Sequence, residues 1–130
     1  MMGMNRVFIL GRLGRDPQHY EDKLGRKFVR LSLATERRWL SDSGKESKTD
    51  WHSVMVWGKR AELCIQYLKK GVPVMVEGSL QSYDSNNENG EKKTHTSILA
   101  SRVEFLPAKQ LDQGPGESRE GIDQGKFTLN

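Results

Sequence analysis

The stretch Trp51-His52-Ser53-Val54-Met55-Val56-Trp57 decides the fold, because its side chains alternate in character along the chain. Successive side chains of a β-strand point to opposite faces of the sheet. Val54 and Val56 therefore share one face, which we expect to be the core. Trp51 and Trp57, six residues apart, share the other face and are expected to be accessible to solvent.

Downstream of this strand the pattern becomes helical. Lys59 to Lys70 carry apolar residues at positions i, i+3, i+4 and i+7, and Gly71 follows as a stop signal, which predicts a helix. Two further strands are predicted at 72–80 and 94–106, where β-branched and apolar residues recur. The polar segment 84–93 between them contains Asn-Gly and predicts an exposed hairpin loop.

Upstream of the deciding strand, two more strands are predicted at 5–11 and 28–34. The segment 41–50 is polar throughout and is expected to be a long exposed loop. The predicted order is thus three strands, one helix and two strands. Five strands with one helix between the third and the fourth is the all-β layout of the OB-fold, a small, partly open barrel.

Composition divides the chain into two parts. Residues 1–106 are expected to form one OB-fold domain and have a net charge of +5, whereas 107–130 have a net charge of −1. The second part is rich in Gly, Gln, Ser, Asp and Glu, so it is expected to be a disordered tail. A basic folded domain is suited to phosphate binding, although many other proteins are equally basic.

Two indoles on one face of a sheet are suited to stacking of nucleobases, an interaction nearly indifferent to base identity. Tyr83 has the parity of the polar residues of 72–80 and is predicted to be a further platform. Trp39 has the parity of the core residues of 28–34, so its exposure would require a bulge or a twist. Alternatively, the tryptophans form the core and the valines of 51–57 face a partner subunit.

Basic residues lie near these aromatic residues in the sequence, and aromatics interleaved with cations form grooves that follow a nucleic-acid backbone. The candidate phosphate-binding residues are Arg12, Arg37, Arg38, Lys45, Lys48, Lys59, Arg60, Lys92 and Lys93. Together with the aromatics they predict sequence-independent binding of a single strand by base stacking and phosphate contacts. These contacts leave DNA and RNA equally possible, because neither reads the 2′-hydroxyl.

Catalytic, metal and cofactor sites are not predicted, and the protein is not expected to be an enzyme. The histidines are scattered, and Cys64 has no histidine near it in the sequence. Asp42, Glu46 and Asp50 share one predicted loop with two lysines and do not follow a regular cation-binding pattern. A single cysteine, no leader and no apolar run of about 18 residues predict an intracellular protein without a membrane span.

Several short phrases in the same order resemble the bacterial single-stranded DNA-binding protein family, and the resemblance covers residues 4–106. They are Met4-Asn5-Arg6-Val7, Gly11-Arg12-Leu13-Gly14-Arg15-Asp16-Pro17, Leu33-Ala34-Thr35, Trp51-His52, Gly58-Lys59-Arg60-Ala61-Glu62, Tyr67-Leu68-Lys69-Lys70-Gly71 and Val76-Glu77-Gly78. The resemblance implies an OB-fold homotetramer in the bacterial cytoplasm, associated with the nucleoid. It also implies that single-stranded DNA wraps around this homotetramer in replication, recombination and repair.

The same resemblance places Trp39, Trp51 and Trp57 at base-stacking positions of that family. The fourth such position coincides with Ser85, and Tyr83 is the nearest aromatic residue.

The chain departs from that family at its end. Members usually close in an acidic tip with a terminal Pro-Phe that docks partner enzymes, whereas this sequence ends Gly125-Lys126-Phe127-Thr128-Leu129-Asn130. We therefore do not expect recruitment of replication and repair proteins by that route. Two alternatives are a primosome-type OB-fold that binds proteins, and an OB-fold nuclease. The nuclease would need clustered carboxylates around a cation, which the predicted strands lack.

Overall fold

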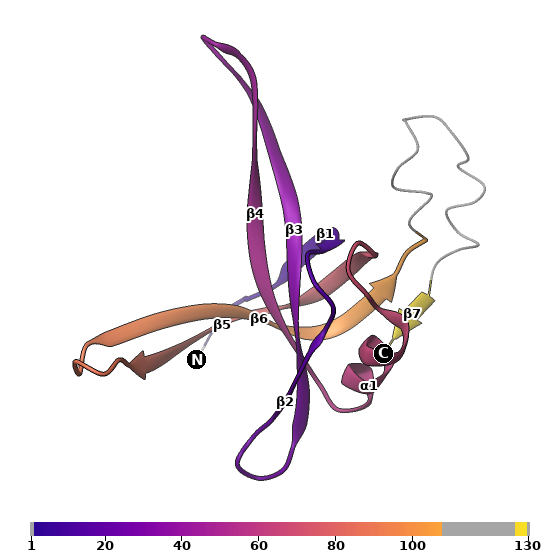
Figure 1. The fold of residues 1–130 in the computed structure, drawn as a ribbon, viewed down its shortest axis with the longest axis vertical. Coiled ribbons are helices and arrows are strands. Elements are labelled where there is room, and N and C mark those ends of the chain that lie inside the picture. The colour runs from indigo at the N-terminus through magenta and orange to yellow at the C-terminus, as the bar shows by residue number, and fades with distance from the viewer. Residues whose placement is uncertain (1, 108–126, 130) are drawn as a thin grey trace.

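The computed structural model describes residues 2–107 and 127–129 and consists almost entirely of strands (Figure 1). In chain order the elements are β1 (Val7–Leu13), β2 (Gln18–Glu21), β3 (Lys27–Ser41), β4 (Gly44–Trp57), α1 (Lys59–Tyr67), β5 (Pro73–Asn86), β6 (Lys92–Phe105) and β7 (Phe127–Leu129). Five strands close into a barrel, because the series β1-β5-β6-β4-β3 returns to β1 where Arg12 lies opposite Ala34. This is the predicted OB-fold, with α1 between the third and fourth barrel strands.

The barrel core consists of the residues that the alternation places inward. Val54 and Val56 of β4 are completely buried, and Val29 and Leu31 of β3 are buried beside them. The side chains of α1 at Ala61 and Cys64, together with the adjacent Leu68, cover one end of the same cluster. The inward face predicted for 28–34 and for 51–57 is therefore confirmed.

The prediction of an exposed loop at 41–50 is wrong, because most of this segment belongs to a long antiparallel ribbon. Ser41 lies opposite Gly44, so only Asp42 and Ser43 form the turn. Beyond the barrel, residues 35–41 and 44–50 form what we call the β3–β4 ribbon, which extends away from the barrel (Figure 1). Both faces of this ribbon meet solvent, so its strands need no apolar alternation and do not resemble strands in the sequence.

The predicted loop 84–93 is corrected in the same way. Residues 82–86 and 92–96 form the β5–β6 ribbon, which extends in a different direction from the first (Figure 1). Its turn closes through a hydrogen bond of 2.9 Å from the Asn87 N–H to the Glu91 carbonyl. Gly90 adopts a φ of 78°, which explains the Asn-Gly pair that marks the turn in the sequence.

Smaller differences concern β2, α1 and the tail. The short strand β2 was not predicted; it pairs with the start of β3 at the edge of the sheet. The helix ends at Tyr67 rather than at residue 70, because Leu68 turns into an extended conformation with its side chain buried. Ile65, one of the four apolar residues whose spacing predicted the helix, is 38% exposed.

The predicted disordered tail lies mostly at 108–126, outside the described residues, but Phe127–Leu129 forms β7 against β6. Among the described residues, no helix has the length and apolar character needed to cross a membrane.

Candidate nucleic-acid interface

The outer face of β2, β3 and β4 carries four aromatic side chains, and we call it the aromatic face. It consists of Tyr20, Phe28, Trp51 and Trp57. Trp51 is 62% exposed, while the valines that alternate with it are in the core. The alternative in which the tryptophans of β4 form the core is therefore excluded for Trp51. Its indole lies against the backbone of Gly14, so one side is supported and the ring stays available to a ligand.

Trp57 belongs to a row of three rings that runs across the aromatic face. Tyr20, Phe28 and Trp57 lie opposite one another on β2, β3 and β4. The ring centroids of Tyr20 and Phe28 are 5.3 Å apart, and those of Phe28 and Trp57 are 4.5 Å apart. Trp57 is therefore partly buried against its neighbour, and the row offers a continuous apolar surface rather than one isolated ring.

Two arginines border this row. The Arg26 guanidinium lies 5.6 Å from the centroid of the Trp57 ring, and that of Arg30 lies 5.4 Å from the Tyr20 ring. Sequence reasoning missed both arginines and also missed Tyr20 and Phe28. The parity of Phe28 and Arg30, opposite to that of the core residues of β3, could have placed them outward. Tyr20 lies in the strand that was not predicted.

Trp39 lies on the β3–β4 ribbon rather than on the barrel. It is 42% exposed and lies opposite Glu46, on the face that continues the core face of β3. Of the two routes to exposure that the sequence left open, a bulge or a twist, the bulge is absent, because the pairing of β3 with β4 runs without interruption past this point. The side chain reaches solvent because the ribbon has left the barrel, and it borders an open groove of about 550 Å³ that Arg38 and Lys45 also line.

The basic residues of this ribbon divide between its two faces. Arg37 and Lys48 are directly opposite each other on the face of Trp39, whereas Arg38 and Lys45 lie on the face of Trp51. Arg37 and Arg38 each form an ion pair with a carboxylate. The Arg37 Nε donates to Asp50 Oδ2 at 2.6 Å, and the Arg38 Nε donates to Glu36 Oε1 at 3.0 Å.

These ion pairs affect both acids. The hydrogen bond from Arg37 holds the pKa of Asp50 below its usual value, and the hydrogen bond from Arg38 does the same for the pKa of Glu36.

Tyr83 is 42% exposed on the β5–β6 ribbon, away from the β3–β4 ribbon. Its ring stacks on His95 with centroids 5.0 Å apart, and His95 Nε2 is 2.8 Å from Ser85 Oγ. Lys93 lies opposite Ser85 on this face, whereas Lys92 lies on the other face and pairs with Asp84 at 3.2 Å. His95 was not singled out by the sequence, because only the strand pairing places it beside Tyr83.

The remaining candidates lie at the ends of the barrel. Arg12 donates from Nη1 to the Gly71 carbonyl at 2.9 Å and lines a groove of about 380 Å³ at the base of the β3–β4 ribbon. Lys59 and Arg60 are the first residues of α1, which Gly58 separates from Trp57, and Lys59 is the more exposed of the two. The predicted residues therefore occupy the aromatic face, the ends of the barrel and two separate ribbons rather than one groove.

The described residues contain no group of three His, Cys, Asp or Glu side chains placed to hold a metal ion. The three acids considered in the sequence as a cation site are spread along the turn and β4; they are Asp42, Glu46 and Asp50. Asp50 forms an ion pair with Arg37.

Comparison with known proteins agrees with this geometry. A model described as the single-strand binding protein family matches residues 4–106. Single-stranded DNA-binding protein 1 of Chlorobaculum tepidum is 40% identical over 127 residues, which cover 95% of this chain and 76% of that protein. Single-stranded DNA-binding protein 1 of Xylella fastidiosa is 37% identical over 123 residues, with coverage of 93% and 90%.

Among solved structures, one titled "Plasmodium falciparum SSB complex with ssDNA" superposes with a TM-score of 0.74 at 32% identity, covering 82% of this chain and 98% of that chain. The barrel, the matched residues and the extent of these similarities lead to one conclusion. This chain belongs to the single-strand binding protein family.

Proposed function

We propose that this protein binds single-stranded DNA without sequence preference, stacking bases on Trp51 and Trp57 and contacting phosphates with the basic residues around them. The observation that carries the proposal is the aromatic face, where exposed Trp51 and the row ending in Trp57 lie on one side of a barrel. Each stacked base contributes roughly 1–3 kcal/mol, nearly independently of its identity. Family membership, and the similarity to a structure titled as a complex with single-stranded DNA, support the same substrate.

The bound strand would extend from the aromatic face onto the two ribbons. On the β3–β4 ribbon, Trp39 and Lys48 would contact the strand. On the β5–β6 ribbon, Tyr83 and Lys93 would contact it. The role is binding without catalysis, in the protection of single strands during replication, recombination and repair. That role, and a location in the bacterial cytoplasm at the nucleoid, rest on the family to which the chain belongs.

A homotetramer is the assembly that we propose for this role. Strand β1 pairs with β5 along Val7–Arg12, but with β3 only at Arg12 and Leu13, so part of its other edge is open. Phe8 is 66% exposed and Leu10 48% exposed on the outer face of this strand. An open edge with exposed apolar side chains favours self-association, and closed point-group symmetry is the usual result. Sedimentation equilibrium should give a tetramer, and Phe8→Glu should shift the protein towards smaller species; a monomeric wild type would refute the assembly.

The DNA-binding proposal is tested by titrating intrinsic tryptophan fluorescence with oligo(dT), oligo(rU) and a matched duplex, at low and high salt. We expect strong quenching by oligo(dT), little by the duplex, and weaker binding by Trp51→Ala. Preference for oligo(rU) would instead indicate an RNA-binding protein.

The second candidate function is that of an OB-fold that binds other proteins. It is favoured by the exposed apolar residues of β1, which suit a protein partner as well as another copy of the chain. If neither single strand quenches fluorescence or binds by anisotropy, this second function replaces the first.

A further inference from the structure

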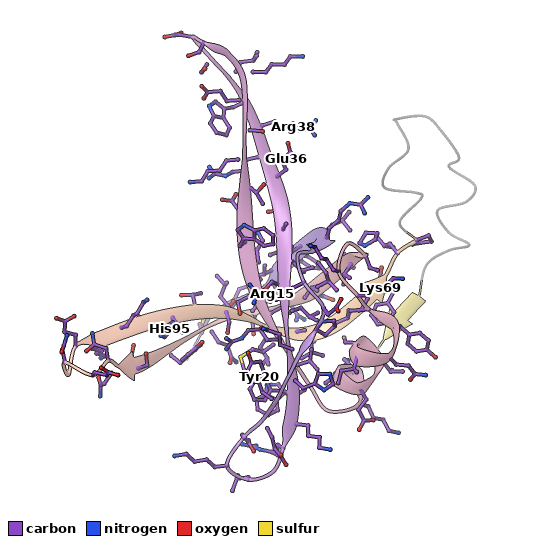
Figure 2. The ribbon with its side chains drawn as sticks, viewed as in Figure 1. Arg15, Tyr20, Glu36, Arg38, Lys69 and His95 are labelled. Atoms are coloured by element: carbon purple, nitrogen blue, oxygen red, sulfur yellow. The ribbon has the colours of Figure 1, made fainter. Side chains whose placement is uncertain are left out.

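Both arginines at the centre of the β3–β4 ribbon are occupied by carboxylates in the same way. Arg37 uses Nε and Nη2 to reach both oxygens of Asp50, at 2.6 and 3.1 Å. Arg38 uses the same two nitrogens to reach both oxygens of Glu36, at 3.0 and 3.2 Å. Figure 2 shows Glu36 and Arg38 close together on the projecting part of β3.

The edge of a guanidinium that binds a carboxylate with two parallel hydrogen bonds is also an edge that binds a phosphate. An arginine whose charge is already balanced by a carboxylate neutralises little of a phosphate's charge, so its contact releases few of the counterions that are condensed on the DNA. As long as the pairs persist, two of the residues expected to contact phosphates contribute little to binding.

Both pairs are accessible to a ligand. Side-chain exposure is 58% for Arg37 and 32% for Asp50, and it is 79% for Arg38 and 47% for Glu36. Ion pairs this exposed are weak, because water screens them and holding two side chains in place costs conformational entropy. A phosphate of the bound strand can therefore compete with either carboxylate.

We propose that Asp50 and Glu36 occupy the phosphate sites of Arg37 and Arg38 in the free protein, and that bound DNA replaces each carboxylate by a phosphate. The inference rests on the proposed function and deepens it, since it identifies two acids that lower the affinity and the salt dependence of binding. The two pairs lie on opposite faces of the ribbon, so each face has one such arginine.

Glu46 provides the matched control. It lies on the same ribbon, opposite Trp39 on the face that also carries Arg37 and Asp50. Within the described chain, no arginine or lysine pairs with it. Glu46→Gln therefore removes one negative charge near the DNA without releasing a guanidinium.

The experiment measures the dissociation constant for labelled oligo(dT) by fluorescence anisotropy over a range of salt concentrations. Asp50→Asn and Glu36→Gln should each tighten binding about two- to fivefold more than Glu46→Gln does, the size expected for release of an exposed pair. Each should also steepen the slope of log K against log salt by about 0.7, the contribution of one added contact to a single strand. Glu46→Gln should leave the slope unchanged.

A double substitution separates release of the arginine from simple loss of charge. In an Arg37→Gln background, Asp50→Asn should have no more effect than Glu46→Gln. Equal effects of all three acid substitutions, or a persistent effect without Arg37, would overturn the proposal. Weaker binding by Asp50→Asn would overturn it too, because Asp50 would then orient Arg37 for DNA.

Two controls complete the test. Asp50→Asn and Glu36→Gln alter different pairs, so a folding defect in one, detected by circular dichroism, leaves the other informative. Failure of the wild type to bind oligo(dT) is a separate outcome that refutes the proposed function and this inference with it.

Discussion

Gly14 lies directly beneath the indole of Trp51, so closely that a Cβ on residue 14 would overlap the six-membered ring. The backbone at Gly14 is held in place by a hydrogen bond of 2.9 Å from its N–H to the Ser32 carbonyl. Because Gly14 cannot easily withdraw, an added methyl group must displace the indole instead. Glycine at this position therefore determines where the exposed indole of the aromatic face lies.

We expect Gly14→Ala to weaken binding to oligo(dT), because displacing the ring forfeits part of the roughly 1–3 kcal/mol that a stacked base contributes. The measurement is a fluorescence titration of the variant beside wild type. Gly3→Ala is the control, since a Cβ at Gly3 meets no atom within 4 Å. Unchanged affinity in Gly14→Ala would show that the position of the indole does not matter for binding.

Trp57 and Trp51 should differ in their effect on stability. Trp57 packs on Phe28 at 4.5 Å, and such aromatic pairs contribute about 0.5–1.5 kcal/mol beyond area burial. Trp57→Ala should therefore lower the thermal midpoint by several degrees, whereas Trp51→Ala, at a 62% exposed position, should change it little. Calorimetry at one fixed protein concentration checks this. A larger loss for Trp51→Ala would contradict the assignment of Trp57 as the structural ring.

Lys93 and Lys92 are adjacent in sequence but should differ in DNA binding. Lys93 shares a face of the β5–β6 ribbon with Tyr83, while Lys92 lies on the other face and pairs with Asp84. Lys93→Ala should weaken binding and reduce the salt slope by about 0.7, the value for one lost phosphate contact. Lys92→Ala should change both less. Similar effects of the two substitutions would argue against a defined DNA path along the face of Tyr83.

Cys64 should be unreactive in the folded protein. Its side chain is completely buried, and burial raises the pKa of the thiol to about 12. A thiol reagent at pH 8 should label it only after denaturation. The folded pKa is raised, so the unfolded chain loses this proton first and folding stability falls as pH rises above about 9, the ordinary value. Rapid labelling of native protein would show that α1 opens readily; Cys64→Ala controls for non-specific labelling.

The barrel could be predicted from the sequence because its strands carry a local signal. In 28–34 and 51–57, one face of each strand is buried, so apolar residues must alternate with polar or aromatic ones. The two ribbons could not be predicted in this way. Their backbone hydrogen bonds are made between strands, while both faces meet solvent, so their composition matches that of loops.

The candidate site was predicted in part for the same reason. Alternation alone placed Trp51 and Trp57 on one face and away from the valines. The stack of Tyr20 on Phe28 and the stack of Tyr83 on His95 depend on strand register, which a single strand's sequence does not contain. The register of β3 against β4 also places the Asp50 carboxylate beside the Arg37 guanidinium.

By itself, the sequence determined the type of fold, the core of the barrel and the presence of exposed tryptophans beside cations. The alternation of apolar and polar residues can be read from neighbouring positions in the chain. It is enough to predict these features, because the hydrophobic effect buries the apolar face of each strand. Only the tertiary structure decided which aromatic ring packs against a neighbour, which one stays exposed to solvent, and which arginines already form ion pairs with carboxylates. Those outcomes depend on distances between residues far apart in the chain, such as Gly14 and Trp51, which exist only once the strands have closed into a barrel.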